Sequence, residues 1–248
     1  MLAEQRHARI LNMVASNGSA SVPELAAALD TSESTVRRDL EKLDQAGKLA
    51  KVHGGATRLA GASVTRDLAL PERFGLNAPE KRQVAAFAAT LVGPDDFVYV
   101  DSGSTTGALL DSLAETRATY VTCSVTHAMR LVEKGCRVIV LGGELKGVTD
   151  ALVGPDALDA LQRYHFSLGF WGTNGATPEE GLTTPDRSEA MVKRVSLERC
   201  DRPYVLCDAT KFGVVASVTF AGFDAATILT ESAPEAYRAY DNVVEVTA

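Results

Sequence analysis

A chain of 248 residues is long enough for one large domain or two unequal ones, which excludes a miniature scaffold. Hydrophobic residues make up 46% of it and charged residues 23%, the balance of an ordinary soluble globular protein, so a mainly disordered chain is excluded as well. The 25 basic and 32 acidic side chains give a net charge of -7, which taken alone argues against a nucleic acid as partner.

The charge is unevenly divided along the chain. Residues 1–60 carry eight Lys and Arg against seven Asp and Glu, a net charge of +1, whereas residues 61–248 carry 17 against 25, a net charge of -8. All of the acidity therefore belongs to the later part, and a DNA-binding function of the first part stays open.

The first 50 residues are predicted to form helices with short joints. Ile10 and Val14 recur at helical spacing, and so do Leu25 and Leu29 after Pro23, a residue favoured in the first turn of a helix. Neither of these two segments has the alternating pattern of a strand.

A third helix is predicted to begin at Thr31 or Ser32, whose hydroxyls can cap free backbone N–H groups, and to end at Gly47. In residues 48–57 apolar residues alternate with polar ones around a double glycine, as in a short strand that enters a tight turn. Three helices followed by a β wing predict a winged helix-turn-helix DNA-binding domain over residues 1–57.

The third helix is the candidate DNA-reading element. Val36 and Leu40 point inward, which leaves hydroxyl and Arg side chains outward at its start, where a recognition helix meets DNA. Arg can donate two hydrogen bonds to guanine or one to phosphate, and small hydroxyls allow close approach. The alternative is a three-helix bundle with a solvated charged face. Together with two wing residues, the candidates are Ser34, Thr35, Arg37, Arg38, Lys51 and His53.

This region resembles a known signature. The run Ser34–Leu40, with Leu43, Gly47 and then Val52–Ala56, is similar to the signature of the DeoR family of bacterial transcriptional regulators. The resemblance implies binding to double-stranded operator DNA. Because a single head with a net charge of +1 offers few phosphate contacts, we expect a homo-oligomer that places two heads on two half-sites.

Residues 58–79 contain Gly61, Pro71, Gly75 and Pro79 with little periodicity, which predicts a linker with at most a short helix. From residue 80 to 248, helical stretches alternate with short apolar runs that suit parallel strands buried on both faces, which predicts a larger α/β domain. The predicted strands are 97–100, 119–122, 138–141, 168–171, 204–207 and 227–229. The predicted helices are 81–92, 105–115, 125–134, 155–163 and 187–201.

The segment that follows the first of these strands is a candidate anion site. Backbone N–H groups at a helix start, together with glycines and hydroxyls, can hold a phosphate or carboxylate. The alternative is that these residues only cap the helix, as small hydroxyl residues commonly do. The candidates are Asp101, Ser102, Gly103, Ser104, Thr105 and Thr106.

Further loops follow other predicted strands, and ligands in open α/β sheets bind beyond the carboxyl ends of strands. Several turns that converge on one edge predict a pocket, to which Lys193 and Lys211 could supply positive charge. The alternatives are a weak surface pair for Glu189 and Lys193 and a turn-forming role for Asp208. These candidates are Gly142, Gly143, Gly172, Thr173, Asn174, Gly175, Thr183, Asp186, Glu189, Lys193, Asp208 and Lys211.

The same motifs extend the resemblance over nearly the whole chain. They look like the C-terminal sensor domain of the DeoR family, which implies a fold akin to ribose-5-phosphate isomerase and the CoA-transferases, with a phosphorylated sugar bound as inducer. Residues 172–175 and 181–186 are similar to regulators of fructose and related hexose phosphotransferase operons. The function expected is a repressor of a sugar-utilisation operon that the sugar phosphate releases from DNA.

One residue departs from the family pattern. Members usually have Thr-Asn-Ser at the end of the second sensor strand, and this chain has Thr122-Cys123-Ser124. A thiol in place of an amide should change the contacts to sugar hydroxyls, so the sugar can differ from the familiar ones. The alternatives for Cys123 are a redox sensor or nucleophile, or a small buried hydrophobe.

Other function classes find little support. His7, His127 and His165 have no metal-ligand spacing with one another or with the cysteines, and no nucleotide-binding motif is present, so we expect no metal and no cofactor. Without Cys-x-x-Cys pairs, a signal-peptide core or an apolar stretch near the ~20 residues of a membrane span, we expect a cytoplasmic protein. The rival function is a sugar-phosphate isomerase or deaminase that uses Asp101, Glu189, Asp208 and the lysines for acid and base chemistry. The attached DNA-reading module favours sensing.

Overall fold

The computed structural model describes residues 3–17, 19–46, 48–57 and 70–247, and the chain forms two compact units, residues 1–62 and 63–248. Residues 58–69 of the expected linker lie outside the described residues. The rest of that linker contains α4 (Leu70–Gly75), a short helix, and the first residues of α5 (Ala78–Thr90). The domain limits at residues 57 and 80 stay predictions.

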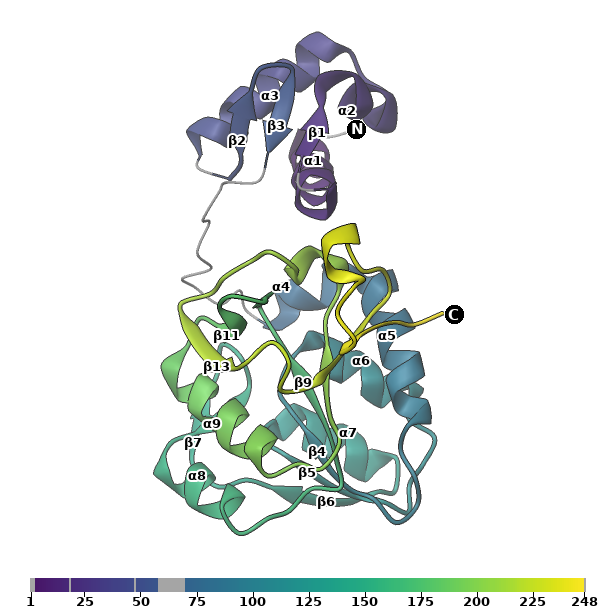
Figure 1. Ribbon diagram of the computed structural model, residues 1–248, viewed down its shortest axis with the longest axis vertical. Coiled ribbons are helices and arrows are strands. Elements are labelled where there is room, and N and C mark those ends of the chain that lie inside the picture. Colours follow the sequence, from purple (N-terminus) through teal and green to yellow (C-terminus); the bar gives the residue numbers. More distant parts are fainter. Residues whose placement is uncertain (1–2, 18, 47, 58–69, 248) are drawn as a thin grey trace. The chain divides into compact units, whose positions relative to one another are not determined.

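The described part of the N-terminal unit contains three helices and a small antiparallel sheet of order β1-β3-β2 (Figure 1). Its core is formed by residues such as Ile10, Leu25, Val36 and Leu40, which the helical spacing placed inward. The strand β1 corrects the sequence analysis, which expected only a joint there; three residues with small side chains give no alternating signal. The elements are α1 (Ala3–Asn17), β1 (Ser19–Ser21), α2 (Val22–Leu29), α3 (Glu33–Gln45), β2 (Ala50–Val52) and β3 (Gly55–Thr57).

The C-terminal unit is built on a parallel sheet of seven strands in the order β15-β14-β12-β9-β4-β5-β6. Six of these strands match the predicted apolar runs, with ends that shift by a residue or so. The seventh, at the edge, was not predicted. The strands are β4 (Phe97–Val100), β5 (Thr119–Thr122), β6 (Arg137–Val140), β9 (Leu168–Gly172), β12 (Pro203–Leu206), β14 (Thr227–Thr230) and β15 (Val243–Glu245).

Helices cover both faces of this sheet, as the predicted α/β class requires (Figure 1). Successive residues of a strand point to opposite faces. Val98 and Val100 of β4 belong to the hydrophobic core under α5, α6 and α7, whereas Tyr99 lies in the second core, with Trp171, under α8 and α9. The helices are α6 (Ser104–Ser112), α7 (Val125–Glu133), α8 (Pro155–Leu161) and α9 (Arg187–Glu198).

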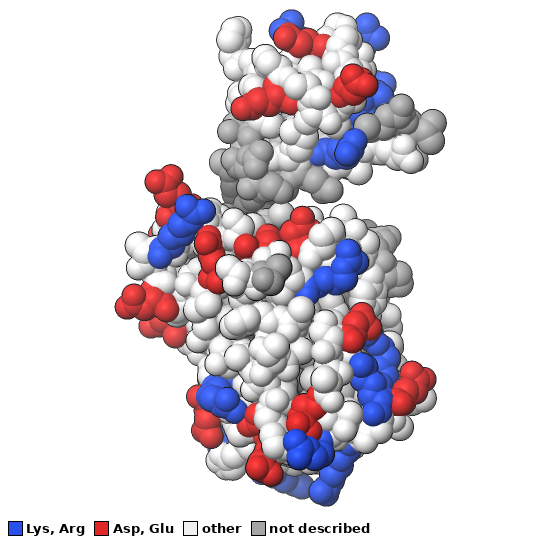
Figure 2. All heavy atoms as spheres, turned by 90° about the vertical axis from the view of Figure 1, so that its right-hand side faces the viewer, with Lys and Arg blue, Asp and Glu red and all other residues white. Residues whose placement is uncertain are grey.

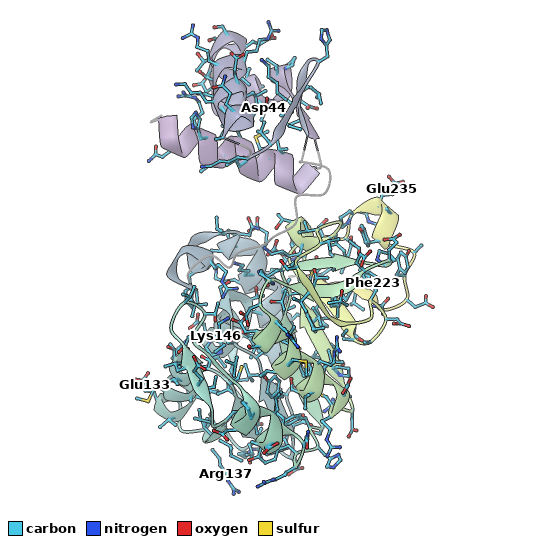
Figure 3. The ribbon with its side chains drawn as sticks, turned by 90° about the vertical axis from the view of Figure 1, so that its left-hand side faces the viewer. Asp44, Glu133, Arg137, Lys146, Phe223 and Glu235 are labelled. Atoms are coloured by element: carbon cyan, nitrogen blue, oxygen red, sulfur yellow. The ribbon has the colours of Figure 1, made fainter. Side chains whose placement is uncertain are left out.

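Short antiparallel strands lie outside the main sheet, and the sequence analysis predicted loops at these positions. Residues 144–153 form the hairpin β7–β8, and a second small sheet has the order β10-β11-β13. Two of the expected loops, around residues 175 and 181–184, are therefore partly strands. Figure 3 shows Glu133 and Arg137 at one end of the unit and Phe223 and Glu235 at the other. The bounds are β7 (Glu144–Lys146), β8 (Ala151–Val153), β10 (Gly175–Thr177), β11 (Gly181–Thr184) and β13 (Val218–Ala221).

Candidate functional site

The outer face of α3 carries the residues predicted to meet DNA. Ser34, Arg37 and Arg38 are exposed and Thr35 is half-buried. The Ser32 hydroxyl accepts a hydrogen bond from the Thr35 backbone N–H at 3.3 Å, so Ser32 rather than Thr31 caps the helix. Arg37 forms a 2.9 Å ion pair with Glu33 on the same helix, but an exposed pair of this kind is worth little. Arg37 can therefore exchange it for a DNA phosphate or base at small cost.

A buried carboxylate fixes α3 against α1. Asp39 is 3% exposed and forms an ion pair with Arg6 and a 2.9 Å hydrogen bond with His7. Its pKa is lowered, because hydrogen bonds from Arg6 and His7 outweigh the effect of burial. Sequence reasoning missed this residue, although its spacing from Val36 already placed a charge on the apolar face of the helix.

The wing presents Lys51 and His53 to solvent. Lys51 lies 3.4 Å from Glu41 of α3, and its backbone N–H donates to Asp44 at 2.9 Å, so the first wing strand is tied to the helix. The turn needs its glycines: Gly54 has a φ of +88°, and a Cβ on Gly55 would lie 2.3 Å from the Ala20 carbonyl oxygen. On the face in Figure 2, basic and acidic side chains are interspersed on this unit.

In the C-terminal unit, three adjacent parallel strands end at one edge of the sheet and bring predicted residues together. Asp101 follows β4, Gly172 ends β9 and Asp208 follows β12. The Gly172 backbone N–H donates to the Asp101 carboxylate at 3.1 Å. This convergence of strand ends is the arrangement from which the pocket was predicted.

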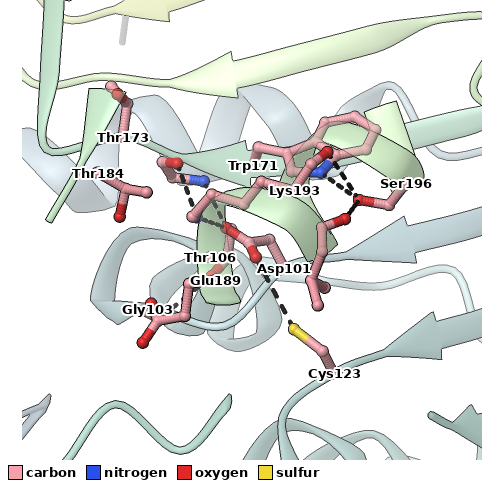
Figure 4. A network of polar contacts seen from close by, with 12 residues as sticks. Asp101, Gly103, Thr106, Cys123, Trp171, Thr173, Thr184, Glu189, Lys193 and Ser196 are labelled. Atoms are coloured by element: carbon pink, nitrogen blue, oxygen red, sulfur yellow. Dashed lines mark hydrogen bonds and ion pairs between the residues drawn. The ribbon is translucent and has the colours of Figure 1, made fainter. Parts of the chain in front are cut away.

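Asp101 and Lys193 form a buried ion pair (Figure 4). The Asp101 side chain is 1% exposed, and the Lys193 ammonium also donates to the Gly172 carbonyl at 3.0 Å and lies 5.5 Å from the centre of the Phe220 ring. Burial raises the pKa of Asp101, although Lys193 acts in the opposite direction. Both predicted residues lie at the site, and each already has the other as its partner.

Glu189 is buried on α9, the helix that also carries Lys193, and it binds the β7–β8 hairpin. Its carboxylate accepts hydrogen bonds from Thr149 at 2.6 Å and from Lys146 at 2.8 Å. Lys146 also forms an ion pair, at 2.7 Å, with Asp186, the residue that caps the start of α9. The alternative of a surface pair between Glu189 and Lys193 is wrong, because both are buried and bind other groups. Lys146 and Thr149 gave no sequence signal, since only the fold brings the hairpin to α9.

The start of α6 fits the predicted anion cradle. Its N-cap is Gly103, with a φ of +142° and no side chain to cap the helix. Thr106 donates its hydroxyl to the Gly103 carbonyl at 3.1 Å, so it does not compete for the free N–H groups. The neighbouring Ser102, Ser104 and Thr105 are buried around this start.

A lysine that the sequence analysis missed lies at this helix start. Lys81 of α5 is 5% exposed, and its ammonium donates to the Ser104 hydroxyl at 2.9 Å and to the Arg73 carbonyl at 2.6 Å. Burial lowers the pKa of Lys81 to about 8; Asp208 opposes this shift, whereas Lys211 adds to it. In the sequence, Lys81 is one polar residue in a helical stretch, which is typical of a solvated helix face. Lys211 ends the short 3-10 helix Ala209–Lys211. Asp208 caps this helix, and its carboxylate accepts a hydrogen bond from the Asn77 amide at 3.0 Å.

Several predicted residues instead serve the fold. A Cβ on Gly143, which has a φ of +121°, would lie 2.4 Å from the Val153 carbonyl oxygen, and one on Gly175 would lie 2.2 Å from that of Val214. The Thr173 hydroxyl donates to the Gly175 carbonyl at 2.7 Å, which closes the turn that holds Asn174. Thr183 is fully buried and accepts from the Ala216 backbone N–H at 2.9 Å. A Cβ on Gly142 would make only an ordinary contact, 3.8 Å from the Asp156 side chain, so close packing does not explain this glycine.

Cys123 lies beneath the site. It is 1% exposed, and its Sγ lies 3.8 Å from the Asp101 carboxylate. Burial and the nearby Asp101 raise the pKa of the thiol to about 12, which disfavours the thiolate that a nucleophile or redox sensor needs. The geometry favours the interpretation of Cys123 as a small buried residue beneath the candidate site.

The described residues contain no group of three or more His, Cys, Asp or Glu that could hold a metal ion. None of the described helices is both long and apolar enough to cross a membrane.

A winged helix-turn-helix unit joined in one chain to an α/β unit is the build of a DNA-binding transcriptional regulator. Residues 6–60 match the DeoR-like helix-turn-helix domain and residues 76–232 match the DeoR C-terminal sensor domain. The chain belongs to the DeoR family, as its motifs predicted.

Individual relatives cover most of the chain. It is 37% identical, over 100% of its length and 97% of the relative's, to an uncharacterized HTH-type transcriptional regulator FruR of Bacillus subtilis (strain 168). It is 30% identical to a lactose phosphotransferase system repressor of Streptococcus mutans serotype c, over 86% of this chain and 85% of the other. A crystal structure of ribose 5 phosphate isomerase A from Neisseria gonorrhoeae is similar with a TM-score of 0.40 and 12% identity, over 54% of this chain and 53% of the other.

Proposed function

We propose that the protein represses a sugar-utilisation operon and that a phosphorylated sugar, bound at the start of α6, releases it from operator DNA. The observation that carries the effector half is the glycine-capped start of α6 with the buried Lys81 ammonium 2.9 Å from the Ser104 hydroxyl. Free N–H groups at a helix start and a lysine beside them are what a phosphate group requires. Repression of a sugar operon is supported by relatives such as the lactose phosphotransferase system repressor.

The residues have separate roles in this proposal. The phosphate accepts from the backbone N–H groups of residues 104–106 and from Lys81, with Lys211 as a second positive charge. The buried pair of Asp101 and Lys193 forms the wall of the site. Because the pair is buried, its role is to hold the Gly172 end of β9 in place, and it adds no net charge to the site. The sugar phosphate binds without turnover and acts as a signal.

The N-terminal unit binds DNA as a recognition helix with a wing. Arg37 and Arg38 contact bases or phosphates from α3, and Ser34 and Thr35 allow close approach. Lys51 and His53 reach the flanking backbone. Two such heads in a homo-oligomer bind two half-sites, which offsets the small charge of one head.

The test is a fluorescence-anisotropy titration of the full chain on the DNA upstream of its own operon, with the phosphate monoesters of fructose, glucose and ribose added one at a time. We expect sequence-specific binding that one of these monoesters weakens and that the unphosphorylated sugars leave unchanged. Binding no tighter than to scrambled DNA would contradict the proposal. So would specific binding that none of the monoesters affects.

A further inference from the structure

The helix α4 is the first described segment after residues 58–69, which connect the sensor unit to the N-terminal unit. It is held at three places by groups of the candidate effector site or its neighbours. α4 is therefore the described part of the C-terminal unit that lies next in sequence to the N-terminal unit.

The first attachment is the Lys81 ammonium. It donates to the Arg73 carbonyl of α4 at 2.6 Å and to the Ser104 hydroxyl at the start of α6 at 2.9 Å. An ammonium has three N–H donors, so these two bonds leave one for a phosphate placed on the helix start. The Lys81 ammonium can thus contact both α4 and a phosphate of the proposed effector.

The second and third attachments lie on either side of the first. Phe74 packs against α6 at Gly107, where an added Cβ would lie 3.0 Å from the Phe74 ring. Leu70, which is 7% exposed, donates its backbone N–H to the Val148 carbonyl at 3.0 Å. Val148 belongs to the β7–β8 hairpin that binds Glu189 through its neighbour Thr149.

We propose that α4 transmits occupancy of the effector site to the DNA-binding unit, with the Lys81 ammonium as the shared contact; this rests on the proposed function. A phosphate on the third N–H fixes the ammonium between the start of α6 and α4, and an ammonium fixed there holds the Arg73 carbonyl more firmly. In the empty site α4 detaches more often, and the bound effector favours the attached state. Such coupling requires that the effector bind the two states unequally.

The first experiment follows amide hydrogen exchange of the full wild-type chain, with and without the releasing monoester from the fructose, glucose and ribose set. We expect slower exchange in residues 70–76 when the effector is bound. Unchanged exchange in that segment, with binding verified by calorimetry, would overturn the relay. This measurement needs no variant and is independent of any folding defect.

The second experiment uses Phe74→Ala, with Tyr240→Ala as the matched control, because the two aromatic residues are 40% and 38% exposed in the same unit. DNA-free Phe74→Ala should still bind the effector, with an affinity lowered at most several-fold, because the effector favours an attached state that this change weakens. DNA release, which typical coupling energies make about tenfold, should fall to about twofold. Tyr240→Ala should release like the wild type.

The outcomes separate the two proposals. If no monoester releases wild-type protein, the proposed function fails and the relay with it. If the wild type is released and Phe74→Ala binds effector and is released equally well, only the relay fails. Loss of effector binding in Phe74→Ala would also overturn the relay, because it would place α4 in the binding site itself.

Discussion

Lys193→Met removes the cation from a buried ion pair and keeps most of the side-chain volume. It leaves the Asp101 carboxylate, whose side chain is 1% exposed, with the Gly172 N–H at 3.1 Å and the weak Cys123 thiol as its remaining donors. Removing one partner of a buried pair costs about 3–5 kcal/mol of stability, and the lost bond to the Gly172 carbonyl belongs to the same perturbation. We therefore expect the free energy of unfolding of the C-terminal unit to fall by about 3–5 kcal/mol near pH 8.

The loss should shrink in acid. Burial already raises the pKa of Asp101, and without Lys193 that pKa rises further in the folded state above the unfolded value near 3.9. A folded state that binds its proton more tightly than the unfolded state loses stability as pH rises from the unfolded pKa to the folded one. Lys193→Met should therefore be closer to the wild type at pH 5 than at pH 8.

The assay is urea unfolding at pH 5 and pH 8, followed by tryptophan fluorescence. The single tryptophan, Trp171, is fully buried in this unit and donates to Ser196 of α9 at 2.9 Å, so it reports on this unit alone. Arg163→Met, at an exposed residue after α8, is the control and should change stability by less than about 0.5 kcal/mol. A loss below about 1 kcal/mol for Lys193→Met, or an equal loss at both pH values, would refute the reasoning.

The remaining predictions concern the two binding functions. Arg38→Ala should weaken operator binding by about 1–3 kcal/mol without unfolding the protein, because the Arg38 side chain is exposed on α3. Anisotropy measures the operator affinity and thermal denaturation measures the stability. An unchanged affinity would exclude Arg38 from the DNA interface. Asp39→Asn should instead lower the stability of the N-terminal unit as well as DNA affinity, because it breaks the ion pair with Arg6 and weakens the hydrogen bond with His7. Retained helicity and melting temperature would be inconsistent with that role. Lys81→Met should keep operator affinity and lose effector release, whereas normal release would place the phosphate elsewhere. In the wild type, effector affinity by calorimetry should fall about tenfold from pH 7 to pH 9, because Lys81 loses its proton around pH 8; a flat profile would exclude its ammonium from the site.

Continuous apolar runs and helix caps were enough to predict the main framework. The run Phe97–Val100 is a strand with the predicted ends, and Ser32 caps α3 as its hydroxyl suggested. Three-residue strands such as β1 and β7 were missed, because so short a segment carries no readable period. Glycine-rich turns were predicted as ligand loops, yet Gly143 and Gly175 are explained by close backbone contacts.

The polar site was predicted residue by residue but not as a set of pairs. Asp101 and Lys193 were both chosen, and only the fold shows that each holds the other across 92 positions of sequence. Lys81 and Asp39 were missed for the same reason: a charged residue on a helix looks solvated until its distant partners are known. Their partners, Ser104 and Arg6, lie 23 and 33 positions away.

The most direct test of the account is operator affinity measured with and without a sugar phosphate, in wild type and in Lys81→Met. The account predicts that wild type and variant bind the same DNA with similar affinity, and that one monoester of the fructose, glucose and ribose set weakens binding about tenfold in the wild type alone. Equal release of both proteins, or no sequence-specific DNA binding by the wild type, would contradict it.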